Sequence, residues 1–282
     1  MVDSTGLLIG IGAAIACGLM LLLWLVQVRT KDASHVDVGW AGGLAILAVV
    51  FAVLGNGDVA HRVLVAVLGG LWGTRLALYL LFNRVLGKEE DGRYKTLRAN
   101  WGDAANVKFF VFFQAQAGFV IAFSIPFALI VGDRSNGLGV LEWIGAALWV
   151  VAVSGEVLAD RQLTRWRANP ANRGTTARTG LWNWSRHPNY FCEWLNWIAF
   201  LLIALAAPHG WIAVEAPVFL LFLLVFVTGI PATEAQAVKS RPDYAQYQRE
   251  VSPFIPWFPK RAEGDAPAPP APPAPPAPQD AA

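Results

Sequence analysis

Long apolar runs, separated by shorter polar segments, follow one another along most of the chain. A helix needs about 20 apolar residues to cross the hydrocarbon core of a bilayer. Seven runs approach or exceed that length, and we predict spans at 6–28, 39–56, 62–83, 107–132, 137–159, 191–208 and 213–231. No basic segment precedes the first run, and it is long enough to span, so we expect a retained helix rather than a cleaved signal peptide.

Composition supports this interpretation. Hydrophobic residues make up 55% of the chain and charged residues only 15%, whereas a soluble domain has about a quarter charged residues. We therefore predict an all-α integral membrane protein, a bundle of about seven transmembrane helices with a polar pocket on the cytosolic side. Residues 1–261 form one predicted membrane domain. Residues 262–282 are rich in Pro and Ala and are predicted to be a disordered tail without a catalytic role.

The Lys and Arg residues are unevenly distributed over the predicted loops. If the N-terminus lies outside, all 22 of them fall in inside segments except Arg62, Arg134 and Arg75. Inside loops are enriched in Lys and Arg, so the distribution predicts an N-out, C-in topology. Attraction to anionic lipid alone also explains such basic loops, without any ligand.

Arg75 lies about two turns inside the third predicted span. A charge at this depth usually faces the bundle interior or a wet cavity. Trp72 and Tyr79, three residues before and four after Arg75, share its helix face. We predict either a functional role or a buried ion pair for Arg75, with Asp37 or Glu193 as its carboxylate partner. Asp37 itself either caps the second span or takes part in function.

Polar residues also gather where the chain leaves and re-enters the membrane between the fifth and sixth predicted spans. Glu156 and Asp160 share one helix face, and Asn189 and Glu193 share another. Pro188 suits the first turn of the re-entering helix.

The start of this helix offers free backbone N–H groups, and Arg186 and His187 add donors at the same place, an arrangement that favours phosphate. The pattern indicates a pocket for a ligand that is anionic at the rim and planar deeper in. A polar network that joins the helices explains the same residues.

Three stretches of the chain match a known family. TGLWNWSRHPNYFCEWLNW and SRPDYAQYQREVSPFIPWFP resemble the C-terminal domain of the steroid 5-alpha-reductase family, and its bacterial branch more closely. TRLALYLLFNR is similar to that family's motif of Arg, Tyr, Asn and Arg. The resemblance covers most of 35–258. The wider superfamily also contains sterol reductases and isoprenylcysteine carboxyl methyltransferases.

The resemblance implies that the bundle binds NADPH from the inside and reduces a carbon–carbon double bond conjugated to a carbonyl. The lipophilic substrate and membrane lipid would be its partners, and nucleic acid would not. Carried over by motif position, the cofactor-binding candidates are Asn83, Arg84, Asp160, Arg165, Arg186, Asn189, Glu193 and Tyr247, and His187 joins them as a donor at the start of the helix. The catalytic candidates are Asp37, Arg75, Tyr79 and Glu193. Trp72 departs from the family, because a proton-donating tyrosine is expected at that position.

Two other functions stay open from the sequence. The methyltransferases of the superfamily take S-adenosylmethionine, and Glu234 and Arg249 would then matter. A lipid-binding homologue without catalysis would also retain the pocket, and Trp72 fits that interpretation. The two cysteines, Cys17 and Cys192, give no metal-ligand spacing, so no metal site is expected.

Overall fold

In the computed structural model, helices account for the regular structure of the described residues, which are 2, 4–227 and 229–260, apart from one bridge between Val2 and Gly55. The helices are α1 (Thr5–Thr30), α2 (His35–Leu54), α3 (Val59–Leu80), α4 (Gly92–Trp101), α5 (Ala105–Ile130), α6 (Val140–Ala168), α7 (Pro188–Ala204), α8 (Glu215–Phe222), α9 (Ile230–Ser240) and α10 (Tyr244–Glu250). Single π-helical turns extend α3 over Leu81–Val85 and α8 over Leu223–Val227. The predicted tail lies outside the described residues.

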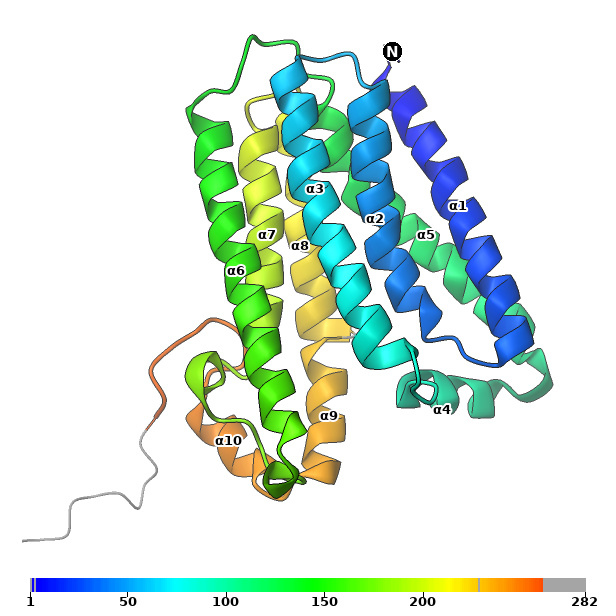
Figure 1. Ribbon diagram of the computed structural model, residues 1–282, viewed down its shortest axis with the longest axis vertical. Coiled ribbons are helices and arrows are strands. Elements are labelled where there is room, and N and C mark those ends of the chain that lie inside the picture. Colours follow the sequence, from blue (N-terminus) through cyan, green and yellow to red (C-terminus); the bar gives the residue numbers. More distant parts are fainter. Residues whose placement is uncertain (1, 3, 228, 261–282) are drawn as a thin grey trace, which may run out of the picture.

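The long helices run along the long axis of the molecule, while α4, α9 and α10 lie at the end opposite the N-terminus (Figure 1). We call these two ends the N-terminal end and the α10 end. Among the described residues, six helical segments are long and apolar enough to cross a membrane: Thr5–Thr30, His35–Leu54, Val59–Val85, Gly92–Ile130, Val140–Ala168 and Gly210–Ser240. The prediction of a multi-pass, all-α membrane protein is confirmed.

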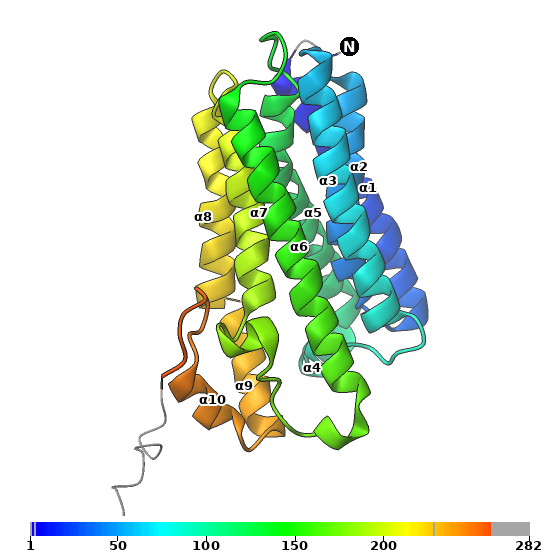
Figure 2. The ribbon, with the colours of Figure 1, turned by 60° about the vertical axis from the view of Figure 1, so that its left-hand side comes forward.

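The sixth predicted span, 191–208, corresponds to a helix that is shorter than these six segments. This helix is α7, which has 17 residues, the lower limit for crossing a bilayer. In two views α7 runs beside α6 along the bundle (Figures 1 and 2). The predicted N-out, C-in orientation stays a prediction, although the N-terminus and α10 do lie at opposite ends.

Glycines let two helix pairs approach closely. A Cβ on Gly73 of α3 would lie 2.9 Å from the Ala41 carbonyl oxygen of α2, and one on Gly145 of α6 would lie 2.8 Å from the Ala199 carbonyl oxygen of α7. Small residues are the usual means of close helix packing in membranes. Close packing of α2 on α3 and of α6 on α7 therefore fixes the side chains that each helix pair presents. We call the boundary between α3 and α6 the seam.

Two boundaries differ from the sequence prediction. The fifth predicted span was expected to end at residue 159, but helix α6 continues to Ala168, so Arg165 and Arg167 lie on the same helix as Glu156. The connections 84–106 and 232–261 contain α4, α9 and α10. These helices are short, and the hydropathy of a span-length window does not detect them.

Candidate functional site

Five polar side chains from three helices meet at span depth in what we call the seam cluster: Arg75, Glu156, Asp160, Asn189 and Glu193. Arg75 of α3 contacts two carboxylates of α6, with Nη2 2.5 Å from Glu156 Oε1 and Nη1 3.2 Å from Asp160 Oδ2. A buried ion pair was one of the two predictions for Arg75. Its ion-pair partners among the described residues are Glu156 and Asp160, however, and not the expected Asp37 or Glu193.

The seam cluster is only partly satisfied by its own members. Arg75 Nε, Glu156 Oε2 and Asn189 Oδ1 are buried atoms without a hydrogen-bond partner. Asn196, seven residues after Asn189 on the same face of α7, leaves both of its amide atoms without partners. Most buried polar groups in proteins are hydrogen-bonded, and the requirement is stricter in hydrocarbon. A group of orphan atoms at one place indicates a site that a ligand or water completes.

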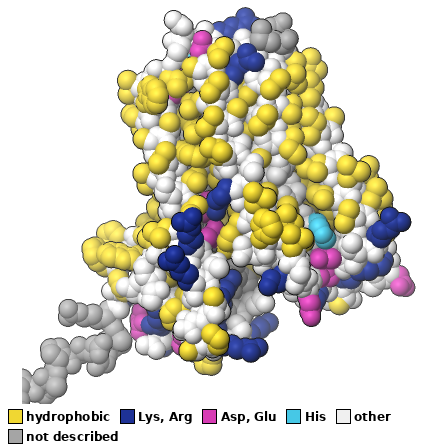
Figure 3. All heavy atoms as spheres, viewed as in Figure 1, with side chains coloured by type: hydrophobic (Ala, Val, Ile, Leu, Met, Phe, Trp, Pro, Cys, Tyr) yellow, Lys and Arg dark blue, Asp and Glu magenta, His cyan; other side chains and the backbone are white. Residues whose placement is uncertain are grey.

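Arg75 makes this cluster reachable from outside the bundle core. Its side chain is 23% exposed, whereas that of Glu156 is 6% exposed. Figure 3 shows Lys and Arg side chains beside Asp and Glu side chains part way along this otherwise largely uncharged face. The Asn189 side chain hydrogen-bonds Asp160, so α7 contributes to the same site.

Glu193 lies deeper, between two indoles. Trp72 Nε1 donates to its Oε2 and Trp197 Nε1 to its Oε1, both at 3.1 Å. Trp72 thus occupies the position of the expected tyrosine with its N–H directed to a carboxylate. Indole N–H is a donor only, so it fixes Glu193 in place and supplies no proton.

The remaining candidates on α3 lie nearer the α10 end. The Tyr79 hydroxyl hydrogen-bonds Thr164 of α6. Asn83 is exposed and donates to the Tyr79 carbonyl oxygen at 2.8 Å. Arg84 is exposed, and so is Arg165 on α6.

A pocket of about 430 Å³ opens at the α10 end of α6. Three arginines line it, Arg167, Arg173 and Arg241, with residues of the loop 168–177. Arg167 interacts electrostatically with Arg84, Arg241 and the Asp160 carboxylate, so like charges gather here. We call this the rim pocket. Its arginines suit an anion, because guanidinium groups bind phosphate in forked geometry.

Arg186, His187 and Tyr247 lie apart from the seam, in a network that we call the latch. Arg186 donates to Glu234 through Nε at 2.6 Å and through Nη2 at 3.2 Å, and its Nη1 donates to the carbonyl oxygens of Gln248 and Val251. His187 Nε2 lies 3.1 Å from the same carboxylate.

Tyr247 completes the latch from α10. Its hydroxyl donates to the Trp182 carbonyl oxygen at 2.5 Å. Burial raises the pKa of Tyr247, so the hydroxyl keeps its proton and stays a donor. The latch holds α9 and α10 against the loop before α7. Arg186, His187 and Tyr247 were predicted to contact the cofactor, but in the structure their polar groups contact other residues of the chain.

The Asp37 carboxylate also makes its contacts outside the seam cluster. Its Oδ2 accepts from Arg93 Nη2 at 2.8 Å, and its Oδ1 accepts from the Tyr94 hydroxyl at 2.7 Å. Arg84 lies 4.0 Å from it. Asp37 is in the first turn of α2, whose cap is Ser34, and it joins α2 to α4. The structure therefore separates Asp37 from Arg75.

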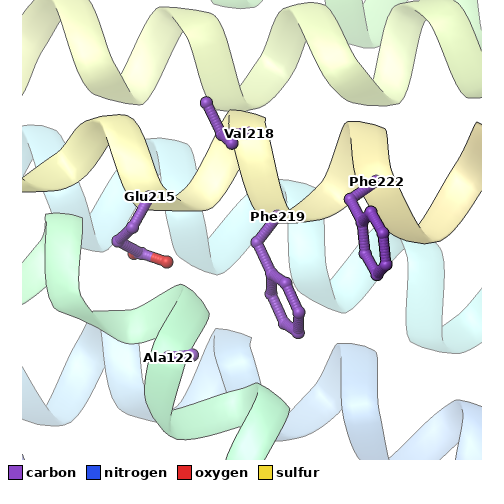
Figure 4. Close-up of a pocket in the computed structure, with 5 residues that line it drawn as sticks. All are labelled: Ala122, Glu215, Val218, Phe219 and Phe222. Atoms are coloured by element: carbon purple, nitrogen blue, oxygen red, sulfur yellow. The ribbon is translucent and has the colours of Figure 1, made fainter.

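A second pocket, of about 570 Å³, lies between α5 and α8 and is almost wholly apolar. Ala122, Val218, Phe219 and Phe222 line it, with Glu215 at one end (Figure 4). Phe219 packs on Phe123, and Phe123 packs on Trp197 with ring centroids 4.7 Å apart. A continuous aromatic path thus joins this groove to the indoles around Glu193.

The sequence prediction placed Glu156 on the same helix face as Asp160 but did not include it among the site residues. It did not include Asn196 either. The helical spacing from Asp160 and from Asn189 was the available signal. It also overlooked the buried group His61, Asp133 and Glu142 at the N-terminal end, whose members are far apart in the sequence.

Comparison with known proteins gives a family and a distant relative. The model of a family described as "Protein of unknown function (DUF1295)" matches residues 23–251. The uncharacterized protein C594.04c of Schizosaccharomyces pombe is 27% identical over 264 residues, which span 83% of this chain and 76% of that protein. No solved structure matches the chain.

Proposed function

The chain belongs to the DUF1295 family, whose function is unknown, and we propose that it is an NADPH-dependent membrane reductase. The proposed reaction reduces a carbon–carbon double bond conjugated to a carbonyl in a steroid-like or isoprenoid-like substrate. The choice of reaction rests on the motif resemblance to the steroid 5-alpha-reductase family. The proposed location is a bacterial inner membrane with the α10 end inside.

One observation carries the proposal: the seam cluster contains buried polar atoms that the chain leaves without partners. Orphan atoms on Arg75, Glu156 and Asn189 face a site whose arginine is partly exposed. An unsatisfied buried polar group costs about 1–3 kcal/mol. A purely structural network would be expected to satisfy its members, as Arg186 and Glu234 of the latch do.

The residues present fit a dinucleotide. The rim pocket offers Arg167, Arg173 and Arg241 to phosphate groups, and a bound anion would relieve the repulsion among them. The amide of Asn189 would hydrogen-bond a planar carboxamide at the seam. When bound, the cofactor supplies a hydride.

The chain's own groups would prepare the acceptor. Arg75 is paired with Glu156 and Asp160, but its buried Nε has no partner and would donate a hydrogen bond to a carbonyl oxygen on which negative charge develops. The Tyr79 hydroxyl holds a proton about one turn nearer the rim. Glu193 acts as a positioning residue, because both of its oxygens accept from indoles. The apolar groove beside Phe219 provides a route for a lipophilic substrate from the bilayer.

The methyltransferase alternative receives less support. It would use Glu234, but both oxygens of that carboxylate already accept hydrogen bonds from Arg186 and Gln248. No observation on the described residues favours S-adenosylmethionine over NADPH.

The test is a titration of the detergent-purified protein with NADPH, followed by its fluorescence. We expect saturable binding that the double substitution Arg167→Gln/Arg241→Gln weakens at least tenfold, since hydrogen bonds to charged groups contribute about 1.5–3 kcal/mol each. Arg29→Gln, an exposed arginine at the end of α1, is the matched control and should bind as the parent does.

Two outcomes contradict the proposal. One is the absence of NADPH binding by a folded protein. The other is stabilisation by S-adenosylmethionine in a thermal melt in which NADPH has no effect, because a ligand at 100 times its Kd stabilises the folded state by about 2.7 kcal/mol.

A further inference from the structure

A second group of metal-ligating side chains lies at the N-terminal end, away from the seam. His61 comes from the first turn of α3, Asp133 from the turn after α5 and Glu142 from the first turn of α6. Their exposed fractions are 1%, 3% and 3%. One ligand atom of each residue lies within 4.8 Å of the other two. Three separate segments thus bring an imidazole and two carboxylates together at one buried position.

The spacing suits a metal ion. His61 Nε2 lies 3.1 Å from Glu142 Oε1 and 3.6 Å from Asp133 Oδ2. Around a tetrahedral ion with ligands about 2.1 Å away, neighbouring ligand atoms are about 3.4 Å apart. The His61 distances therefore bracket the edge of such a polyhedron, and the ligand oxygens of Asp133 and Glu142 lie within 4.8 Å of each other.

Charge gives an independent argument. Both carboxylates lie against the His61 ring, and a protonated imidazole would balance the charge of only one of them. A buried charge without a counter-charge is strongly unfavourable, and a divalent cation balances both carboxylates while the imidazole stays neutral.

Asp133 is already oriented for ligation. The Ser135 backbone N–H donates to its Oδ1 at 2.9 Å, and the Ser135 hydroxyl to its Oδ2 at 3.0 Å. Outer hydrogen bonds of this kind hold ligands in place in known metal sites. The carboxylate thus has a fixed direction before any ion arrives.

We propose that His61, Asp133 and Glu142 form a binding site for a divalent metal ion. One nitrogen and two oxygen ligands fit a borderline cation such as Zn²⁺, and three protein ligands leave a fourth position open. The ion would fasten α3 and α6 to the turn after α5 at the end of the bundle opposite the seam cluster.

The probe is Zn²⁺ itself, added to protein purified without a histidine tag and treated with EDTA. After removal of free metal, we expect about one Zn²⁺ per chain by elemental analysis. We also expect the melting temperature to rise by roughly 5 °C or more at saturating Zn²⁺. Glu142→Gln and, separately, Asp133→Asn should lose both effects. Using two variants keeps the test informative if one of them fails to fold.

His209→Asn is the matched control, since His209 is an exposed imidazole in the α7–α8 connection at the same end. It should keep the bound Zn²⁺. The proposal is overturned if the EDTA-treated parent neither retains Zn²⁺ nor gains thermal stability, which leaves an ion pair of protonated His61. It is also overturned if His209→Asn, and not Glu142→Gln, abolishes retention, because the ion then binds the surface.

Discussion

The latch and the seam cluster are built from the same kinds of side chain but differ in how completely they are paired. In the latch, Glu234 accepts hydrogen bonds from Arg186 and Gln248, and the remaining Arg186 donor reaches two carbonyl oxygens. In the seam cluster, Arg75 Nε and Glu156 Oε2 are buried without partners. Both groups contain an arginine and carboxylates, so composition alone does not distinguish them.

The difference separates structural roles from ligand binding. A buried ion pair stabilises a fold only when its hydrogen bonds are satisfied, and the latch meets this condition with groups from α9, α10 and the loop before α7. The seam cluster does not meet it. Such unpaired groups are typical of functional sites, which give up stability for chemistry. Substitutions should therefore act on stability in the latch and on ligand binding in the seam.

The largest expected effect follows removal of the latch arginine. Arg186→Met leaves Glu234 buried without its main counter-charge and deprives two carbonyl oxygens of a donor. We expect a loss of about 3–5 kcal/mol in the free energy of unfolding, measured by denaturation in mixed micelles, and faster proteolysis of 229–260. Arg249→Met, an exposed arginine of α10, should change stability by less than about 0.5 kcal/mol.

A double substitution sharpens this prediction. Arg186→Met/Glu234→Leu should recover part of the lost stability, because no unpaired charge remains. If Arg186→Met instead leaves stability unchanged and weakens NADPH binding, the latch is part of the ligand site and the distinction between the two regions is wrong.

The next effect has the opposite sign and concerns Asn196. Its amide is buried without partners, so Asn196→Leu, of similar shape, should raise the free energy of unfolding by about 1 kcal/mol or more and weaken ligand binding. Gln27→Leu is the matched control. Gln27 is equally buried but accepts from Arg98 at 3.1 Å, so its replacement should destabilise. Equal destabilisation by both variants would show that Asn196 is already satisfied.

The sequence predicts the spans well because hydropathy acts over about 20 residues, and the long helices match the predicted ranges to within a few residues except at the end of α6. Helices α4, α9 and α10 are short, and their positions depend on tertiary contacts such as Asp37 with Tyr94. Helical spacing correctly put Glu156 and Asp160 on one face, but it does not show which helix that face meets. For that reason the ion-pair partners of Arg75 are not the expected ones, although Glu193 does interact with Arg75 electrostatically.

Contacts between residues that are far apart in the sequence explain the other features that the sequence did not predict. Arg186 and Glu234 are 48 residues apart, and His61 and Glu142 are 81 apart. No local motif indicates either pair. The sequence thus identified Arg186 as a chemically important group, whereas the structure shows that its partners come from the chain itself.

The smallest expected effect is a pH dependence at the surface of the latch. Hydrogen bonds from Gln246 and Arg178 keep the pKa of Glu250 below its ordinary value of 4.5, although burial acts against them. Burial also raises the pKa of Asp243, but hydrogen bonds from the Thr176 hydroxyl and backbone outweigh it and keep that pKa below 3.8. A carboxyl group with a lowered folded-state pKa contributes stability above its unfolded pKa and loses that contribution as the pH falls through its folded pKa.

Helices α9 and α10 should therefore stay packed on the rest of the chain at pH 6–7, and their contacts should weaken as the pH falls below about 4.5. Both groups are partly solvated, so we expect less than about 1 kcal/mol from each. Glu250→Gln should make proteolysis of 229–260 less dependent on pH between 6 and 4, and Glu89→Gln, an exposed carboxyl before α4, should not. At pH 6 the parent's latch is intact, and the loss of less than about 1 kcal/mol in Glu250→Gln should leave its NADPH affinity close to that of the parent. A clear loss of binding in Glu250→Gln at pH 6 would mean that the latch and the rim pocket are coupled, for example through Arg241 between α9 and α10.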